Sequence, residues 1–212
     1  MDSRFATRPR AHRDPEIVKG KLARLDEPHL APLTQLVRRM NRPPEQVAPW
    51  FDPDSGGVGA RVLFLLENPG PKASAQRGSG FISPDNDDTT AETFFRLLAE
   101  SGLPRAETVN WNVVPWYQPD GQTRTANATR GDVEHARPWL EQLIQLLPRL
   151  RLVITKGVPA RDGWMRLLAT DPSIPLLPTI AVPHCSPRNL ASRPDDRAFI
   201  LAAMRRSAAL LV

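Results

Sequence analysis

Residues 61–70 read Arg-Val-Leu-Phe-Leu-Leu-Glu-Asn-Pro-Gly and are the strongest indication of fold class in the chain. The apolar run in this stretch is typical of a strand that is buried on both faces, as in a parallel sheet. It breaks into Glu67, Asn68, Pro69 and Gly70, whose residue types favour a turn. Ligand sites in open α/β sheets lie at the carboxyl ends of such strands. Asn68 is therefore a candidate site residue.

Helix-like and strand-like segments alternate along the rest of the chain. Apolar residues recur at helical spacing in residues 30–40, 89–102, 133–147, 161–169 and 198–211. Thr89 and Glu92 have the spacing of a capping box. Further strands are expected at residues 108–114, 152–155 and 179–182. Strands separated by helices predict an α/β fold with three α/β/α layers and a central, mainly parallel four-stranded sheet.

The length and composition of the chain favour one domain behind a short basic arm. At 212 residues, of which 41% are hydrophobic, the chain is long enough for one substantial core. Residues 1–25 are rich in charge and weakly periodic, so we expect a loosely ordered arm that either contacts phosphates or is simply solvated. Residues 26–212 then form the single domain. The absence of a membrane-length apolar run indicates a cytoplasmic protein without a membrane partner.

Charge and cysteine content limit the partners and cofactors. The net charge of +5 favours contact with a polyanion such as nucleic acid. Cys185 is the only cysteine, which excludes an intramolecular disulfide, a cluster held by four thiolates of one chain, and a cysteine-rich zinc site. The histidines show no ligand spacing; they are His12, His29, His135 and His184. We therefore expect neither a metal nor a cofactor.

Polar residues follow three of the expected strands. Asn68 follows the first, Asn112 lies at the end of the second, and His184 follows the last. Each has a simpler explanation, as a turn residue, a buried amide or a structural histidine. Because the carboxyl ends of parallel strands meet at one edge of a sheet, these residues are expected to converge on one site.

Together these segments resemble the uracil-DNA glycosylase superfamily over about residues 47–189. Residues 66–70 resemble its first motif, particularly the Gly-Ile-Asn-Pro-Gly form of the mismatch-specific branch. Residues 112–114 resemble the segment with the base-reading Asn, and residues 184–187 resemble the His-Pro-Ser-Pro second motif. Residues 137–141, continuing to 152–157, resemble the helix–strand–Gly unit of the thermophilic branch.

The resemblance implies an enzyme of base excision repair that flips uracil out of DNA, hydrolyses its N-glycosidic bond and leaves an abasic site. In this pattern, His184 would donate a hydrogen bond to the charge that develops on uracil O2. Asn112 would accept from N3–H and donate to O4, so that cytosine, with the opposite polarity at both atoms, is rejected. Asn68 would hold the attacking water.

Three more residues are expected at the base pocket. Phe81 resembles the aromatic residue that stacks on the flipped base, and packing in the core is the alternative. Gly70 stands where the uracil-specific branch carries a Tyr that blocks the thymine methyl group, so larger bases could enter. Glu67 is expected to bind the base or to orient water.

Ser186 and Arg188 are expected to contact DNA. Ser186 would bind a backbone phosphate, with a plain turn hydroxyl as the alternative. Arg188 stands where relatives often carry a Leu that wedges into the base stack, and it could reach a phosphate or the opposite base. Lys156 is expected to position phosphate or loop backbone, so a monofunctional glycosylase is indicated rather than a lyase that forms a Schiff base.

Two alternatives remain open at this level. One is a glycosylase of broader range that acts on xanthine or hypoxanthine. The other is a DNA-binding protein that recognises uracil or abasic sites with little turnover. In each case the partner is DNA that contains uracil or another deaminated base, and a monomer is expected.

Overall fold

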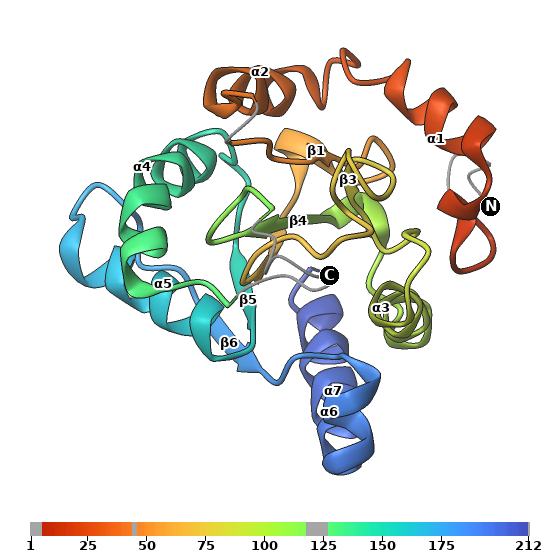
Figure 1. The fold of residues 1–212 in the computed structure, drawn as a ribbon. Helices are drawn as coiled ribbons and strands as arrows, with labels where there is room; N and C mark the ends of the chain where they lie inside the picture. The colour runs from red at the N-terminus through yellow and green to blue at the C-terminus, as the bar shows by residue number, and fades with distance from the viewer. Residues whose placement is uncertain (1–5, 44–45, 118–126, 212) are drawn as a thin grey trace.

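The computed structural model describes residues 6–43, 46–117 and 127–211, and a four-stranded sheet forms its centre. The strands are β2 (Val62–Leu66), β4 (Thr108–Asn112), β5 (Leu152–Lys156) and β6 (Thr179–Val182). Their spatial order is β4-β2-β5-β6, and each neighbouring pair is parallel. Helices connect the strands and cover both faces (Figure 1). The predicted three-layer α/β/α fold with a central parallel sheet is confirmed.

Each face of the sheet has its own helical layer (Figure 1). On one face lie α4 (Arg130–Gln145) and α5 (Val158–Thr170), with α2 (Ala31–Met40) packed against α4. On the other face lie α3 (Thr89–Ser101) and α7 (Asp195–Ala209), with the short helix α6 (Pro187–Ser192) beside them. Two 3-10 turns complete the connections: η2 (Gly57–Gly59) and η3 (Arg105–Glu107). No helix within the described ranges combines the length and apolar character needed to cross a membrane.

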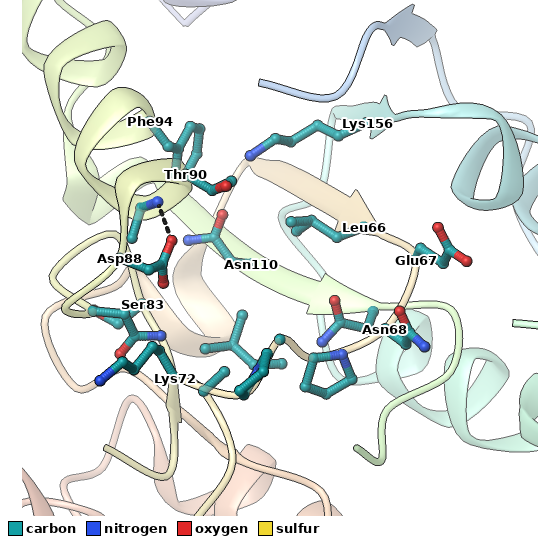
Figure 2. Close-up of a pocket in the computed structure, with 18 of the residues that line it drawn as sticks. Leu66, Glu67, Asn68, Lys72, Ser83, Asp88, Thr90, Phe94, Asn110 and Lys156 are labelled. Carbon is teal, nitrogen blue, oxygen red and sulfur yellow. Dashed lines mark hydrogen bonds between the residues drawn. The ribbon is translucent and has the colours of Figure 1, made fainter. Parts of the chain in front are cut away.

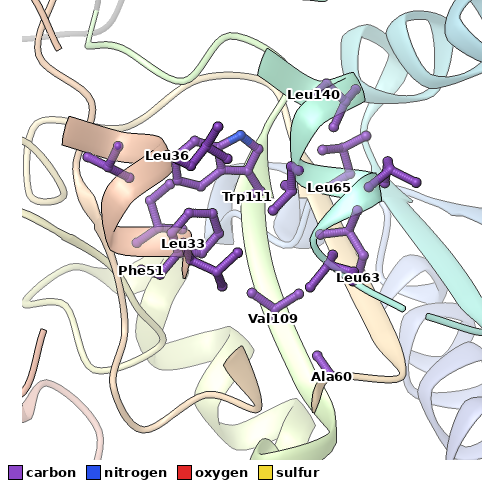
Figure 3. Close-up of a cluster of buried hydrophobic side chains, with 14 of the residues drawn as sticks. Leu33, Leu36, Phe51, Ala60, Leu63, Leu65, Val109, Trp111 and Leu140 are labelled. Atoms are coloured by element: carbon purple, nitrogen blue, oxygen red, sulfur yellow. The ribbon is translucent and has the colours of Figure 1, made fainter. Parts of the chain in front are cut away.

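Alternate residues of each strand pack into the two helical layers, as the pleat of a strand requires. Leu65 faces the α2 and α4 side, where the ring of Phe51 stacks on Trp111 with centroids 4.0 Å apart (Figure 3). Phe64 faces α3 and α7, and its ring meets that of Phe94 edge-on at 4.9 Å. The sheet therefore separates two apolar cores, and the parity of a strand residue decides which layer its side chain joins.

A second, two-stranded sheet lies beside the main one and was not predicted. It pairs β1 (Trp50–Phe51) in parallel with β3 (Phe81–Ile82). Strands of two residues are too short to show periodicity in a sequence. Their pairing brings Phe81 into the buried cluster with Phe51.

The N-terminal segment is more ordered than its composition predicted. Residues 11–22 form a 3-10 turn, η1 (Ala11–Arg13), and a helix, α1 (Pro15–Leu22), so the expectation of a loosely ordered arm does not hold for them. Lys21 of α1 is only 4% exposed. Its Nζ lies within 3.0 Å of carboxylate oxygens of Asp52, Asp54 and Asp85. This charge pairing anchors the segment to the domain.

The start of α3 differs from the expected capping box. Asp88, rather than Thr89, is the N-cap residue, and its carboxylate accepts a hydrogen bond from the backbone N–H of Ala91 at 2.8 Å. Asp at this position satisfies one of the donors that the first turn of a helix leaves unpaired. A capping box forms instead at α4, between Thr129 and Asp132.

Candidate active site

A cavity of about 450 Å³ opens at the carboxyl edge of the sheet, on the side covered by α3 (Figure 2). Cavities of roughly 300–1,000 Å³ are typical of small-molecule sites. Its lining comes from the turn after β2, from β4 and β5, from the loop after β6 and from the first turns of α3. These segments lie far apart in the sequence and meet because all four strands run parallel.

The residues predicted at three separate strand ends line this one cavity. They are Asn68, Asn112 and His184. Glu67 and Gly70 line it as well. The strand register explains the convergence, because Leu66 pairs with Asn112 at the edge of the sheet.

Two asparagines of β4 present unused hydrogen-bonding atoms at the cavity. Asn110 and Asn112 point to the same face of the strand because they are two residues apart. Among the residues that the structure describes, Nδ2 of Asn112 and Oδ1 of Asn110 are buried without a partner. A buried polar group in this state costs about 1–3 kcal/mol, which a hydrogen-bonding ligand would offset. Asn110 was not predicted, although its spacing from Asn112 would have indicated it.

His184 reaches the cavity from the loop after β6 and is neutral near pH 7. Burial, and then the positive charge of Lys156, lower the pKa of His184 to about 4. A neutral imidazole carries one N–H and can still donate a hydrogen bond. The loop is tied to α6, because the side chain of Asn189 donates to the carbonyl of His184 at 3.3 Å.

The turn after β2 is held in place by backbone pairing. The N–H of Val113 donates to the carbonyl of Leu66 at 2.8 Å, and the N–H of Val114 donates to the carbonyl of Glu67 at 3.0 Å. The carboxylate of Glu67 accepts the N–H of Ala128 at 2.8 Å, so it also anchors the segment before α4. These contacts fix the position from which Asn68 enters the cavity.

Lys156 and Phe94 form a contact that the sequence did not predict. Lys156 ends β5, is 2% exposed, and places its Nζ 3.6 Å from the centroid of the Phe94 ring. Both residues line the cavity (Figure 2). A buried ammonium over an aromatic face is a cation–π contact.

Residues 53–206 match the model of the uracil DNA glycosylase superfamily. The chain belongs to this superfamily. The resemblance read from the motifs is thereby confirmed, and membership supports DNA glycosylase activity. No curated protein sequence matches the chain.

Two solved structures resemble the chain at low sequence identity. The crystal structure of Pedobacter heparinus SMUG2 has a TM-score of 0.53 at 11% identity, covering 72% of this chain and 76% of that chain. An NMR structure of a candidate uracil DNA glycosylase from Methanosarcina acetivorans has a TM-score of 0.43 at 13% identity, covering 70% and 93%. At these identities, the first likeness establishes the fold alone.

Phe81, which was expected to stack on the base, does not line the cavity. It is fully buried in the core cluster, and its ring is 5.7 Å from that of His12. Its neighbours Ile82 and Ser83 line the cavity, whereas Phe81 points into the core. The aromatic ring at the cavity belongs to Phe94. The core-packing alternative for Phe81 therefore describes its position.

Ser186 and Arg188 lie at the start of α6 and are not among the residues that line the cavity. Ser186 is the N-cap of α6 and accepts the backbone N–H of Asn189 at 3.4 Å. Arg188 is exposed on α6. Their expected contacts with DNA stay predictions, and Ser186 already has the local role of a turn hydroxyl.

A buried ionic cluster stands behind the cavity wall. Ligand atoms of His12, Asp52 and Asp85 lie within 4.8 Å of one another, an arrangement that could hold a metal ion. The ammonium of Lys21 already bonds Asp52 and Asp85, and the guanidinium of Arg105 pairs with the same two carboxylates at 3.2 and 2.9 Å. We therefore describe the cluster as structural.

The cluster reaches the cavity through two lining residues. Ser83 donates a short hydrogen bond to Asp52, and the carbonyl oxygen of the Asn86 side chain bonds the His12 ring at 2.8 Å. Ser83 and Asn86 both line the cavity. The ionic cluster thus supports one wall of the site.

Proposed function

We propose that the protein is a monofunctional, monomeric DNA glycosylase that hydrolyses the N-glycosidic bond of uracil in DNA. The observation that carries this proposal is the convergence of Asn68, Asn112 and His184 on one cavity. A base inside a duplex cannot reach such a cavity, so the nucleotide must first be flipped out of the helix. The product is an abasic site, which places the reaction in base excision repair.

Bond cleavage leaves negative charge on the base and positive charge on the sugar. The C1′–N1 bond breaks with both electrons moving to uracil, and a water oxygen forms the new bond to C1′. The water proton passes to solvent. His184, neutral near pH 7, donates a hydrogen bond to uracil O2 as charge develops there. Removing one such donor lowers the rate by roughly 10²–10³-fold in other enzymes.

Asn112 supplies base selection in this proposal. Its side chain accepts a hydrogen bond from uracil N3–H and donates one to O4, which would satisfy its unpartnered Nδ2. Cytosine carries an acceptor at N3 and a donor at the 4-position. Both contacts would then be lost inside a buried site, where unpaired polar groups are costly.

Asn68 orients the attacking water, with Glu67 beside it. An amide is not basic near neutral pH, so Asn68 positions water without removing its proton. It also lacks the charge that would stabilise a cationic sugar. We expect a slower enzyme than relatives with Asp at this position, and this feature also leaves room for a uracil or abasic-site binder with little turnover.

DNA would approach over the mouth of the cavity. The net charge of +5 favours the phosphate backbone. In this proposal Ser186 contacts a phosphate and Arg188, exposed on α6, enters or flanks the space left by the flipped base.

A broader substrate range is the second candidate, and Gly70 favours it. Gly70 lines the cavity, and a Cβ added there would meet nothing within 4 Å. The cavity of about 450 Å³ is therefore not narrowed at this point, and xanthine or hypoxanthine could be admitted.

A cleavage assay tests these proposals. The protein is incubated with an oligonucleotide that contains uracil, xanthine or hypoxanthine, and abasic sites are then cleaved with alkali. We expect cleavage by the wild type and its loss in His184→Ala and Asn112→Ala. His135→Ala, on the exposed surface of α4, is the matched control and should cleave like the wild type. A mobility shift without cleavage by the wild type would indicate a binding protein instead.

A further inference from the structure

Lys156 is a buried cation without an acidic partner among the residues that the structure describes. Its side chain is 2% exposed and lines the cavity, and its ammonium group contacts the face of the Phe94 ring. The acidic lining residues are otherwise engaged: Asp88 accepts the N–H of Ala91, and Glu67 accepts the N–H of Ala128. Burial of an ammonium without a counter-charge is strongly unfavourable. The charge is compensated once an anion occupies the cavity.

Lys156 belongs to the inner end of the cavity rather than to the end that holds Asn68. Figure 2 shows its side chain directed toward Phe94 and Thr90, near Asn110, while Glu67 and Asn68 lie at the opposite side. The alternation along β5 agrees, since Ile154 packs in the layer of α3 and Lys156 follows at the same parity. This position suits contact with the base and not attack on the sugar.

We propose that Lys156 is a catalytic residue that stabilises the departing base as an anion, a role that rests on the proposed glycosylase function. As the C1′–N bond breaks, its electron pair spreads over the ring and carbonyl oxygens of the base. The fixed ammonium compensates this charge without transferring a proton, and the free base takes up a proton from solvent after release.

In this proposal Lys156 and His184 have different roles toward the departing base. Lys156 carries the positive charge, and that charge helps to keep His184 neutral by lowering the pKa of the imidazole. His184 then acts as a hydrogen-bond donor, while Lys156 supplies the compensating charge. Preorganised charges of this kind act most strongly in a site from which water is excluded.

If Lys156 compensates the negative charge of the departing base, its contribution to the rate should depend on the acidity of that base. A base with a more acidic ring nitrogen, such as 5-fluorouracil, bears the negative charge more easily and needs less help. Single-turnover rates should be measured on oligonucleotides with uracil and with 5-fluorouracil. For Lys156→Met we expect roughly a 10²-fold loss on uracil and a distinctly smaller loss on 5-fluorouracil. An equal loss on both bases, or no loss, would overturn the proposal.

Lys72→Met is the matched control. Lys72 lines the mouth of the same cavity but is exposed to solvent, so the substitution changes charge by the same amount outside the buried end. It should leave the ratio of the two rates as in the wild type. A ratio that changes equally in both variants would mean that general positive charge, rather than Lys156, sets the dependence.

Two further measurements separate this role from a structural one. Removing an uncompensated buried cation should leave the thermal midpoint of Lys156→Met equal to or above that of the wild type. A clearly lower midpoint would assign Lys156 to the fold instead. Free 5-fluorouracil should also bind the wild type more tightly as the pH rises through the ionisation of that base, and pH-independent binding would overturn the proposal. This binding test holds even if the wild type releases neither base, a result that would refute the glycosylase function itself.

Discussion

Replacing Lys21 by Met should destabilise the whole domain, because Lys21 is the centre of the buried ionic cluster. Its Nζ lies 2.8 Å from Asp52, 3.0 Å from Asp54 and 2.7 Å from Asp85. Arg24 and Arg105 remain as the other cations of the cluster. In the variant, the carboxylates of Asp52, Asp54 and Asp85 therefore have only two guanidinium groups to balance their negative charge.

The expected magnitude follows from that imbalance. Removing one partner of a buried ion pair costs about 3–5 kcal/mol. The unfolding free energy of a domain is about 5–15 kcal/mol, so this is a large share. A chain of this length loses about 2–4 °C of thermal midpoint for each kcal/mol, which gives a decrease of roughly 6–20 °C.

The effect should also depend on pH in a defined direction. Burial alone would raise the pKa of Asp52, but the charges of Lys21 and Arg105 outweigh it and lower that pKa below its usual value. The stabilisation that the charged Asp52 gains from Lys21 and Arg105 is therefore present above about pH 4, the ordinary pKa of an Asp, and is lost as the pH falls further. The difference between the wild type and Lys21→Met should shrink in that acidic range.

Urea unfolding at pH 7 and below pH 4 measures both effects. Lys19→Met is the matched control, because Lys19 lies on the same helix with a side chain 78% exposed. It should change the unfolding free energy by no more than about 0.5 kcal/mol. The same midpoint for both variants, or a difference that does not change with pH, would refute the reasoning.

Three further predictions concern the cavity. The pKa of His184 is lowered from 6.5 to about 4, so between these pH values the unfolded chain binds a proton that the folded chain does not. The unfolding free energy of the wild type should therefore decrease as the pH is lowered from 6.5 to about 4, and it should decrease less steeply in His184→Gln. Equal slopes of unfolding free energy against pH, measured by urea unfolding, would contradict this. Gly70→Tyr should fold normally, since its Cβ meets open space, and should lose xanthine and hypoxanthine release by at least about 10-fold relative to uracil. An equal loss on every base in the cleavage assay would argue against an open pocket at this residue. Asn68→Asp supplies a base for the water and a charge for the sugar, so uracil release should rise by roughly 10²-fold; unchanged or slower turnover would count against the role of Asn68.

The strand ends could be predicted from the sequence because they depend on simple patterns. Asn68 and His184 follow short apolar runs, and Asn112 ends an expected strand. The alternation of strands with helices sets the parallel order. Parallel order alone brings such residues to one edge of a sheet. The sequence therefore predicts which loops meet, without any knowledge of side-chain packing.

Residues whose roles depend on packing could not be predicted in the same way. Phe81 belongs to a two-residue strand, which has no periodicity to show its inward direction. Lys21 lies in a charged segment that looks solvated, and its partners Asp52 and Asp85 are 31 and 64 residues away. Lys156 contacts a ring from another element, which no local pattern indicates.

The side chains of β4 alternate between the core and the cavity, so both depend on the register in which this strand pairs with its neighbour. Trp111 lies in the core between two asparagines of the opposite face, and the N–H of Val113 bonds the carbonyl of Leu66 directly after the strand. A shift by one residue would turn an indole into the cavity and amides into the core. A single-residue deletion within β4 should thus abolish both folding and base recognition. Substitutions at Asn110 or Asn112, in contrast, can alter base recognition without preventing folding.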